Sequence, residues 1–171
     1  MRTRQLATLG LSVVCLGVMG ASTAGAQSGQ AGTSKSTHVL ITPDQLKWGP
    51  APPSLPPGAQ VAVLDGDPAQ AGVPFAIRVK FPDGYKIAPH WHPTDENVVV
   101  LSGTFMVALG DKMDVAAMHT MTAGTYAKMP QRTNHYAMAK GETVVQVYGV
   151  GPFQVTYVNP DDDPRKKSAS R

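Results

Sequence analysis

The fold is decided by the stretch APHWHPTDENVVV, residues 88–100, in which two histidines one residue apart precede a glutamate. In a β-strand successive side chains alternate between the two faces, so His90 and His92 project to one side and Trp91 to the other. The two histidine Cα atoms are then ~6.6 Å apart, a spacing from which both imidazoles can reach one ion. A Pro-Thr-Asp turn follows, and Glu96 opens a further strand from which it can lean back toward the same point.

A third histidine, His135, begins a predicted strand after Pro130. Three neutral imidazoles and one carboxylate suit Fe, Mn, Ni, Cu or Zn, and octahedral geometry leaves two positions open for water, O₂ or substrate. We therefore expect one divalent transition metal, whose identity the sequence does not specify. The alternative is that the paired histidines are ordinary surface residues of a strand.

Short β-branched or alternating runs, separated by Gly, Pro and Asp, fill the sequence from Val61 onward. Strands at this spacing, with no convincing amphipathic helix among them, predict an all-β sandwich or barrel. The predicted strands are Val61–Leu64, Phe75–Phe81, Ile87–His92, Asn97–Leu101, Thr104–Leu109, Tyr126–Met129, His135–Ala139, Thr143–Val150 and Phe153–Val158. The charged tail, residues 161–171, is expected to be disordered.

Two glycine-bounded motifs surround the histidines. The first reads Gly84, five residues, His90, one residue, His92, three residues, Glu96, six residues, Gly103. The second reads Gly124, five residues, Pro130, four residues, His135. Together they resemble the two motifs of the cupin superfamily, and the resemblance covers roughly residues 61–158. It implies a double-stranded β-helix, the cupin-type jelly-roll barrel, holding a metal ion on four ligands: His90, His92, Glu96 and His135.

The second motif departs from the family pattern at two positions. Arg132 stands where the family commonly has glycine, and Ala139 where it commonly has asparagine. The first departure concerns the turn at Arg132, and the second removes a hydrogen bond that the asparagine would make behind the ligands. We expect Arg132 at the barrel mouth, where it could meet an anionic substrate; simple surface exposure is the alternative. Where strands reverse, Gly84 and Gly103 are expected to adopt positive φ.

Further pocket candidates come from strand alternation. Gln146 and Tyr148 share one face of their predicted strand, and a barrel interior would make them polar groups of the pocket; the same face could equally point outward. Arg78 lies on the face of its predicted strand opposite the apolar residues, so its side chain is expected to be solvated. The run Met118-His-Thr-Met121, with Met113 nearby, could offer soft ligands to Cu(I), but methionine usually fills gaps in a core.

The N-terminus has the three-part layout of a secretory signal peptide. Arg2 and Arg4 precede an apolar run of 14 residues, 6–19, and the small residues 24–26 follow. This run is shorter than the roughly 20 residues that a transmembrane helix needs. The two arginines are not adjacent, so export through a Sec-type route is expected, with cleavage after Ala26 and a periplasmic or secreted mature protein.

Composition and charge limit the partners. The only cysteine, Cys15, lies in the apolar run, so the mature chain can form neither a disulfide nor a thiolate metal site. Without Arg2 and Arg4 the 12 acidic residues face 13 lysines and arginines, a nearly neutral balance that predicts neither nucleic-acid nor membrane binding. Residues 27–40 are expected to be a flexible leader and residues 41–160 the cupin domain.

The domain is expected to open with a proline-rich segment, residues 48–58, which lies extended across its surface and is anchored by Trp48 and Leu55. A homodimer formed through this segment is a further prediction. The function that these features favour is an exported mononuclear-metal enzyme, dioxygenase-like, acting on a small molecule. The alternative is a non-catalytic cupin module that binds or senses a metal or small ligand, favoured by the scarcity of acid and base groups beyond the ligands.

Overall fold

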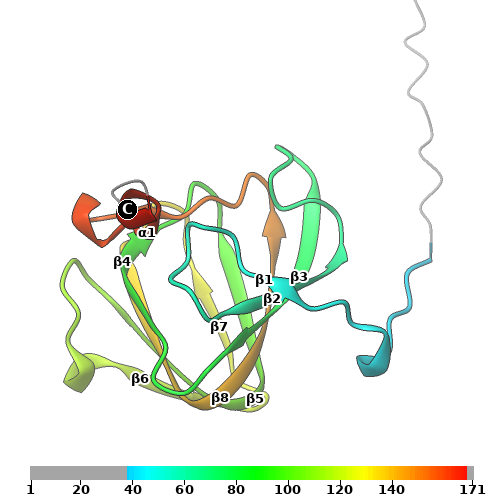
Figure 1. The fold of residues 1–171 in the computed structure, drawn as a ribbon, viewed down its shortest axis with the longest axis horizontal. Coiled ribbons are helices and arrows are strands. Elements are labelled where there is room, and N and C mark those ends of the chain that lie inside the picture. The colour runs from blue at the N-terminus through cyan, green and yellow to red at the C-terminus, as the bar shows by residue number, and fades with distance from the viewer. Residues whose placement is uncertain (1–37, 169–171) are drawn as a thin grey trace, which may run out of the picture. The chain divides into compact units, whose positions relative to one another are not determined.

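A computed structural model describes residues 38–168 as a nearly all-β domain (Figure 1). The predicted signal peptide, residues 27–37 of the leader and residues 169–171 lie outside the described residues. Every strand pairing is antiparallel, and the sheet curls into a jelly roll, which confirms the predicted fold class. The strands are β1 (Gly49–Pro50), β2 (Gln60–Asp65), β3 (Pro74–Phe81), β4 (Lys86–Trp91), β5 (Glu96–Leu109), β6 (His119–Thr122), β7 (Tyr126–Met129), β8 (His135–Val150) and β9 (Thr156–Tyr157).

Two long strands, β5 and β8, organise the sheet. They pair with each other along most of their length, from Asn97↔Tyr148 to Leu109↔His135. On its other side β8 pairs with β3 through residues 143–150 and with β4 through residues 135–138. Because β8 pairs with β3 along one part of its length and with β4 along another, both strands contribute to the same interior. There the predicted metal ligands of β4 lie beside the start of β8.

Each long strand replaces two shorter strands of the sequence interpretation. Gly103 and Gly141 each fall between two predicted strands and have positive φ of 76° and 73°, but in the structure they lie within continuous strands. The β5–β8 register shifts around Ser102, and the Thr143 side chain, 0% exposed, occupies this irregularity. Its hydroxyl accepts a hydrogen bond from Thr104 N–H at 3.1 Å and lies 3.0 Å from Thr104 O, to which it can donate. The glycines therefore bend the strands instead of ending them.

Alternation along the strands builds the core. In β3, Phe75, Ile77, Val79 and Phe81 are buried, whereas Arg78 is half-buried on the opposite face and donates to Gln146 Oε1 at 3.4 Å. Phe81 stacks on Phe105 of β5, with ring centroids 5.6 Å apart. This packing leaves the interior almost entirely apolar away from the histidines.

The proline-rich segment, residues 48–58, packs against the domain as expected, but it turns at residues 53–55 and 57–58 instead of lying extended throughout. Leu55 contacts the core, and Lys80 Nζ lies 4.7 Å from the centre of the Trp48 ring. Two core tyrosines fasten the segment: Tyr85 donates its hydroxyl to Pro56 O, and Tyr157 donates to Ser54 O at 2.8 Å. Both anchors are backbone carbonyls.

The chain's end differs from the expected disordered tail. Residues 160–162 form a 3₁₀ turn and α1 (Pro164–Ser168) is a short helix. The Asn159 side chain caps the turn at Asp161 N–H, and Arg165 binds both Asp163 and the carbonyl of Val155. Within residues 38–168, no helix is long and apolar enough to cross a membrane.

Candidate metal centre

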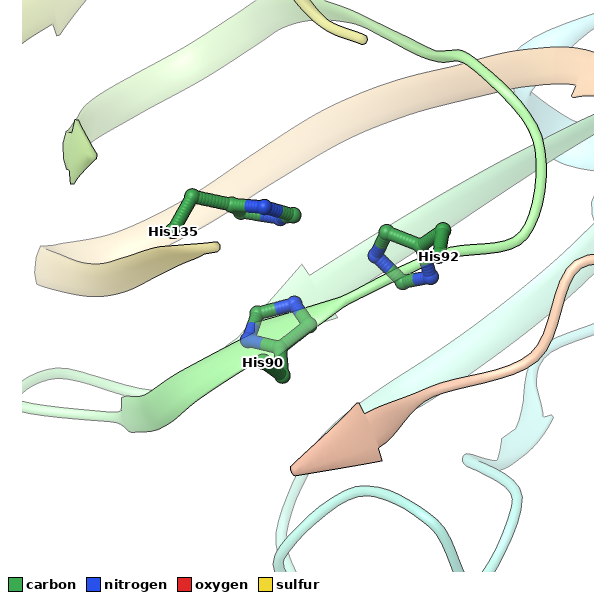
Figure 2. A group of neighbouring side chains, drawn as sticks. All are labelled: His90, His92 and His135. Atoms are coloured by element: carbon green, nitrogen blue, oxygen red, sulfur yellow. The ribbon is translucent and has the colours of Figure 1, made fainter. Parts of the chain in front are cut away.

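Three buried histidines meet inside the barrel (Figure 2). His90 lies on β4, directly across from His135 at the start of β8, and His92 follows the end of β4. Strand alternation places His90 and His92 on one side, as predicted, and Trp91 is only half-buried on the other. One ring nitrogen from each histidine lies within 4.8 Å of the others, so the three could hold a metal ion.

Backbone carbonyls orient all three rings. The Nδ1 atoms of His90, His92 and His135 lie 2.8, 2.8 and 2.9 Å from the carbonyl oxygens of Ala88, Gln154 and Thr133. A carbonyl can only accept, so each Nδ1 must carry a hydrogen and each neutral ring presents an Nε2 lone pair. Phe153 adds a stacking contact to His92, with centroids 4.2 Å apart and an interplanar angle of 16°.

Glu96, the first residue of β5, completes the cluster. Its Oε2 lies 3.2 Å from His135 Nε2 and 3.6 Å from His92 Nε2. These two nitrogens are buried, and neither makes a hydrogen bond. Nitrogen lone pairs facing a carboxylate oxygen repel one another unless a cation, either a proton or a metal ion, lies between them. The donor set therefore fits a bound cation.

The pKa values follow from burial and mutual charge. Burial, with the positive charge that His135 and His92 can carry, lowers the pKa of His90 to about 3. Burial likewise lowers the pKa of His92. Burial also disfavours the charged form of His135, but the neighbouring Glu96 outweighs it and raises the His135 pKa. Burial opposes ionisation of Glu96, yet the adjacent histidines lower its pKa to about 2. At neutral pH Glu96 is thus an anion and His90 a neutral donor.

The two loops that carry these residues are tied together. Asp95, just before Glu96, accepts a hydrogen bond from Gln131 N–H at 2.8 Å and pairs with Lys128 Nζ at 2.6 Å. A second link joins the same two loops, because Arg132 N–H donates to His92 O at 2.8 Å. These bonds set the approach of His135 to the other two histidines.

Arg132 has the backbone conformation of a glycine. Its φ is +57°, and it is the only non-glycine residue with positive φ among residues 38–168. This conformation directs its N–H toward His92 while Thr133 O takes the hydrogen of His135 Nδ1. The Arg132 side chain is exposed, with Cζ 5.8 Å from the centre of the Trp91 ring.

A cavity of about 430 Å³ leads to the cluster. His90 and Glu96 contribute to its lining, and its walls are mostly apolar, with Phe81, Phe105 and Phe153 among them. Exposed residues of the proline-rich segment, of β2 and of the loop around Asp67 also line it, so it opens to the surface there. The cluster is therefore accessible to a small molecule from this side.

The other polar candidates lie away from this cavity. Gln146 faces outward, where it accepts from Arg78, and Tyr148 on the same face is 38% exposed. Neither they nor Arg132 line the cavity, so the structure corresponds to the outward-facing alternative for Gln146 and Tyr148 and to simple surface exposure for Arg132. The Ala139 position is buried in the core. It leaves no ring unsupported, because backbone carbonyls hold every Nδ1.

The two methionines of the Met-His-Thr-Met sequence pack in different hydrophobic clusters. Met121 packs in the main core, whereas Met118 belongs to a second cluster with Ala108 and Tyr136, against which Met106, Met113 and Met138 pack. His119 between them is exposed. This arrangement agrees with a packing role.

Sequence reasoning missed the residues that support the histidines. Ala88, Thr133 and Gln154 act through their carbonyl oxygens, which every residue type possesses. Only Phe153 and Asp95 gave any signal, the first as an apolar residue of a predicted strand and the second as a turn residue beside Glu96.

Comparison with known proteins agrees with this architecture. A family model described as a cupin domain matches residues 77–151, which span β3 to the end of β8. The chain therefore contains a cupin domain. No curated protein matches it significantly.

Several solved cupin-like structures share the fold. A candidate acetylacetone dioxygenase from Methylibium petroleiphilum PM1 is 21% identical, covers 80% of this chain and 96% of its own, and has a TM-score of 0.59. The polyketide cyclase RemF from Streptomyces resistomycificus is 15% identical over 78% of this chain and 94% of its own, with a TM-score of 0.58. KdgF from Halomonas sp. is 21% identical over 67% and 96%, with a TM-score of 0.51. At these identities the likeness establishes the fold, and the reaction must be argued from the site.

Proposed function

We propose that this cupin is an exported mononuclear-metal enzyme, a dioxygenase-like oxidoreductase that acts on a small molecule. The observation that carries the proposal is the convergence of three buried histidines, with the Glu96 carboxylate beside two of them, at the inner end of an open cavity. Two relatives of the same fold are named for enzymatic reactions on organic substrates, which supports a catalytic use of the scaffold.

His90, His92 and His135 would bind the ion through Nε2, and Glu96 would bind it through its carboxylate. The fit is chemical: imidazole and carboxylate suit first-row transition metals such as Fe, Mn, Ni, Cu and Zn. A divalent ion held there would supply Lewis acidity and open positions for substrate oxygen atoms and O₂.

The protein's own contribution is orientation and exclusion of water. The carbonyls behind each Nδ1 fix the direction of the rings, so that little reorganisation is needed when an ion is bound. The aromatic and aliphatic cavity walls offer water few partners, so a bound molecule would displace it from the inner end; the apolar walls lower the local dielectric, which strengthens every charge interaction there.

Export is proposed on the N-terminal pattern alone, with Arg2 and Arg4 before the apolar run and small residues at its end. A chain exported unfolded would acquire its metal outside the cytosol. Zn²⁺ and Cu²⁺ bind imidazole-rich sites more tightly than Fe²⁺ and Mn²⁺, so the compartment influences which ion is found.

The test is elemental analysis of the mature protein from an exported preparation. We expect about one equivalent of transition metal, lost in a His90→Ala/His135→Ala double variant. The matched control is His38→Ala/His119→Ala, which removes two exposed histidines and should retain the metal. Equal metal content in both double variants, or none in the wild type after reconstitution, would refute the site.

A non-catalytic binding module is the second candidate. It is favoured by the cavity lining, which within the described residues offers Asp67, His90 and Glu96 as its only ionisable side chains. O₂ consumption by the metal-loaded protein with diketone or phenol substrates distinguishes the two, because a binding module would retain such compounds without consuming O₂.

A further inference from the structure

The cavity that leads to the histidine cluster carries information about the ligand. It measures about 430 Å³, near the small end of the roughly 300–1,000 Å³ range of small-molecule sites. Val98, Val145 and Val147 line it beside the three phenylalanines. A molecule that fills this space must therefore expose mainly apolar surface to the protein.

Charge is distributed unevenly around this space. Within the part of the chain that the structure describes, no lysine or arginine lines the cavity. The lining carboxylates are Glu96 at the inner end and Asp67 at the opening, where Asp67 also accepts a hydrogen bond from Ala69 N–H. An anionic group seated near the opening would meet the like charge of Asp67 and no lysine or arginine, so its desolvation would be uncompensated there.

Polar partners for a hydroxyl-rich ligand are also few. Of the uncharged polar residues in the lining, Ser54 and Gln154 lie near the opening, and the Gln154 residue is exposed. The Ser54 and Gln154 carbonyls are already engaged by Tyr157 and His92. A sugar bound in the interior would have several hydroxyls left without partners, which is costly in a buried site.

We propose that the ligand of this site is an uncharged, largely apolar molecule with one polar head, of the kind represented by an alkyl-substituted phenol, and that the site rejects ligands with an anionic group at the opposite end. The polar head points to His90 and Glu96, and the apolar end lies toward Val63 and the opening. This inference rests on the proposed function for the use of the ligand, but the selectivity belongs to the cavity itself.

The test is a matched pair of probes, 4-methylphenol and 4-hydroxybenzoate, which share the phenol head and differ in a methyl or carboxylate at the far end. Binding is measured by calorimetry at pH 7 on the mature chain, as purified with its metal content recorded and again after chelation. We expect 4-methylphenol to bind at least about tenfold more tightly in both forms, because an unpaired carboxylate is costly in an apolar cavity.

Two arginine variants test whether the preference for 4-methylphenol over 4-hydroxybenzoate arises at the cavity opening. Val63→Arg places a cation at the opening, on a residue that is 55% exposed and lines the cavity. It should reduce the preference for 4-methylphenol at least about threefold by pairing with the carboxylate. The matched control is Val150→Arg, on a strand valine that is 45% exposed and does not line this cavity, and it should leave the preference unchanged.

Equal affinities, tighter binding of 4-hydroxybenzoate, or binding of neither probe would overturn the inference. An equal effect of the two arginine variants would overturn it as well. Absence of metal together with a retained preference for 4-methylphenol would reject the proposed function and leave the cavity's selectivity standing, so the two failures are distinguishable.

Discussion

The backbone at Arg132 gives the sharpest test of the structure, because glycine and alanine should exchange their usual order of stability there. At an ordinary position alanine is more stable than glycine by about 0.5–1 kcal/mol, since glycine loses more backbone entropy on folding. At a φ of +57° a side chain with a Cβ instead costs roughly 1–2 kcal/mol. The second effect exceeds the first, so Arg132→Gly should be more stable than Arg132→Ala by about 0.5–1 kcal/mol.

Comparing these two variants removes the contribution of the arginine side chain. Both lose the contact with Trp91, which at 5.8 Å and an exposed site is worth at most about 0.5–1 kcal/mol, so this loss cancels. The measurement is urea unfolding of the metal-free protein, monitored by tryptophan fluorescence. Metal-free conditions prevent changes in metal affinity from contributing to the measured stability.

The neighbouring residue Gln131 is the control. It is exposed, lies in the same turn and does not have positive φ. In Gln131→Ala and Gln131→Gly the ordinary order should hold, with the alanine variant more stable, and both keep the N–H that binds Asp95. If alanine is at least as stable as glycine at position 132, the left-handed conformation and the loop geometry derived from it are wrong.

Three further outcomes are expected. Thr143→Val keeps the shape of the buried side chain but leaves the half-buried Thr104 N–H without its acceptor. The free energy of unfolding should therefore fall by about 1–3 kcal/mol in urea titrations; a change near zero would mean that water replaces the hydroxyl. Glu96 raises the pKa of His135, so binding of metal to the protonated ring must displace a proton, and metal affinity should rise with pH until His135 has lost that proton. Calorimetry below neutral pH in buffers of different ionisation enthalpy should show proton release, whereas buffer-independent heats would contradict this. Burial and the charge of Asp163 raise the pKa of Tyr157 to about 12. Between pH 10 and 12 the unfolded chain therefore loses this proton first. The stability advantage of wild type over Tyr157→Phe, constant below about pH 10, should shrink above it; a constant difference up to pH 11 would argue against the raised pKa of Tyr157.

The sequence was sufficient for those features that depend on periodicity. Alternation placed His90 and His92 on one face, and turn chemistry brought Glu96 back toward them. The length of the strands could not be predicted, because Gly103 and Gly141 have the composition of turns whereas the structure uses them as bends within β5 and β8. The short strand β6 was missed because Met121 is its only buried residue, which is too little alternation to recognise.

The support of the site was not predictable for a different reason. Backbone carbonyl oxygens orient each histidine, and because every residue type has such a carbonyl, the sequence does not indicate which ones do so. The helical end of the chain depends on Arg165 reaching Val155 O, a contact that the charged composition of the tail concealed. The outward face of Gln146 and Tyr148 is set by the pairing of β8 with β3, which requires the topology.

The proline-rich segment combines firm attachment with freedom to vary. Tyr157 and Tyr85 hold it through the carbonyls of Ser54 and Pro56, and the residue between them, Leu55, lines the cavity. Since these two anchors are backbone atoms, they should still hold the segment when the side chain at position 55 is exchanged, although its contact with the core changes. The size of the residue at position 55 should therefore set the size of the molecule that the cavity accepts. A smaller residue enlarges the space beside the opening and a larger one reduces it, while the fold and the histidine cluster stay as they are.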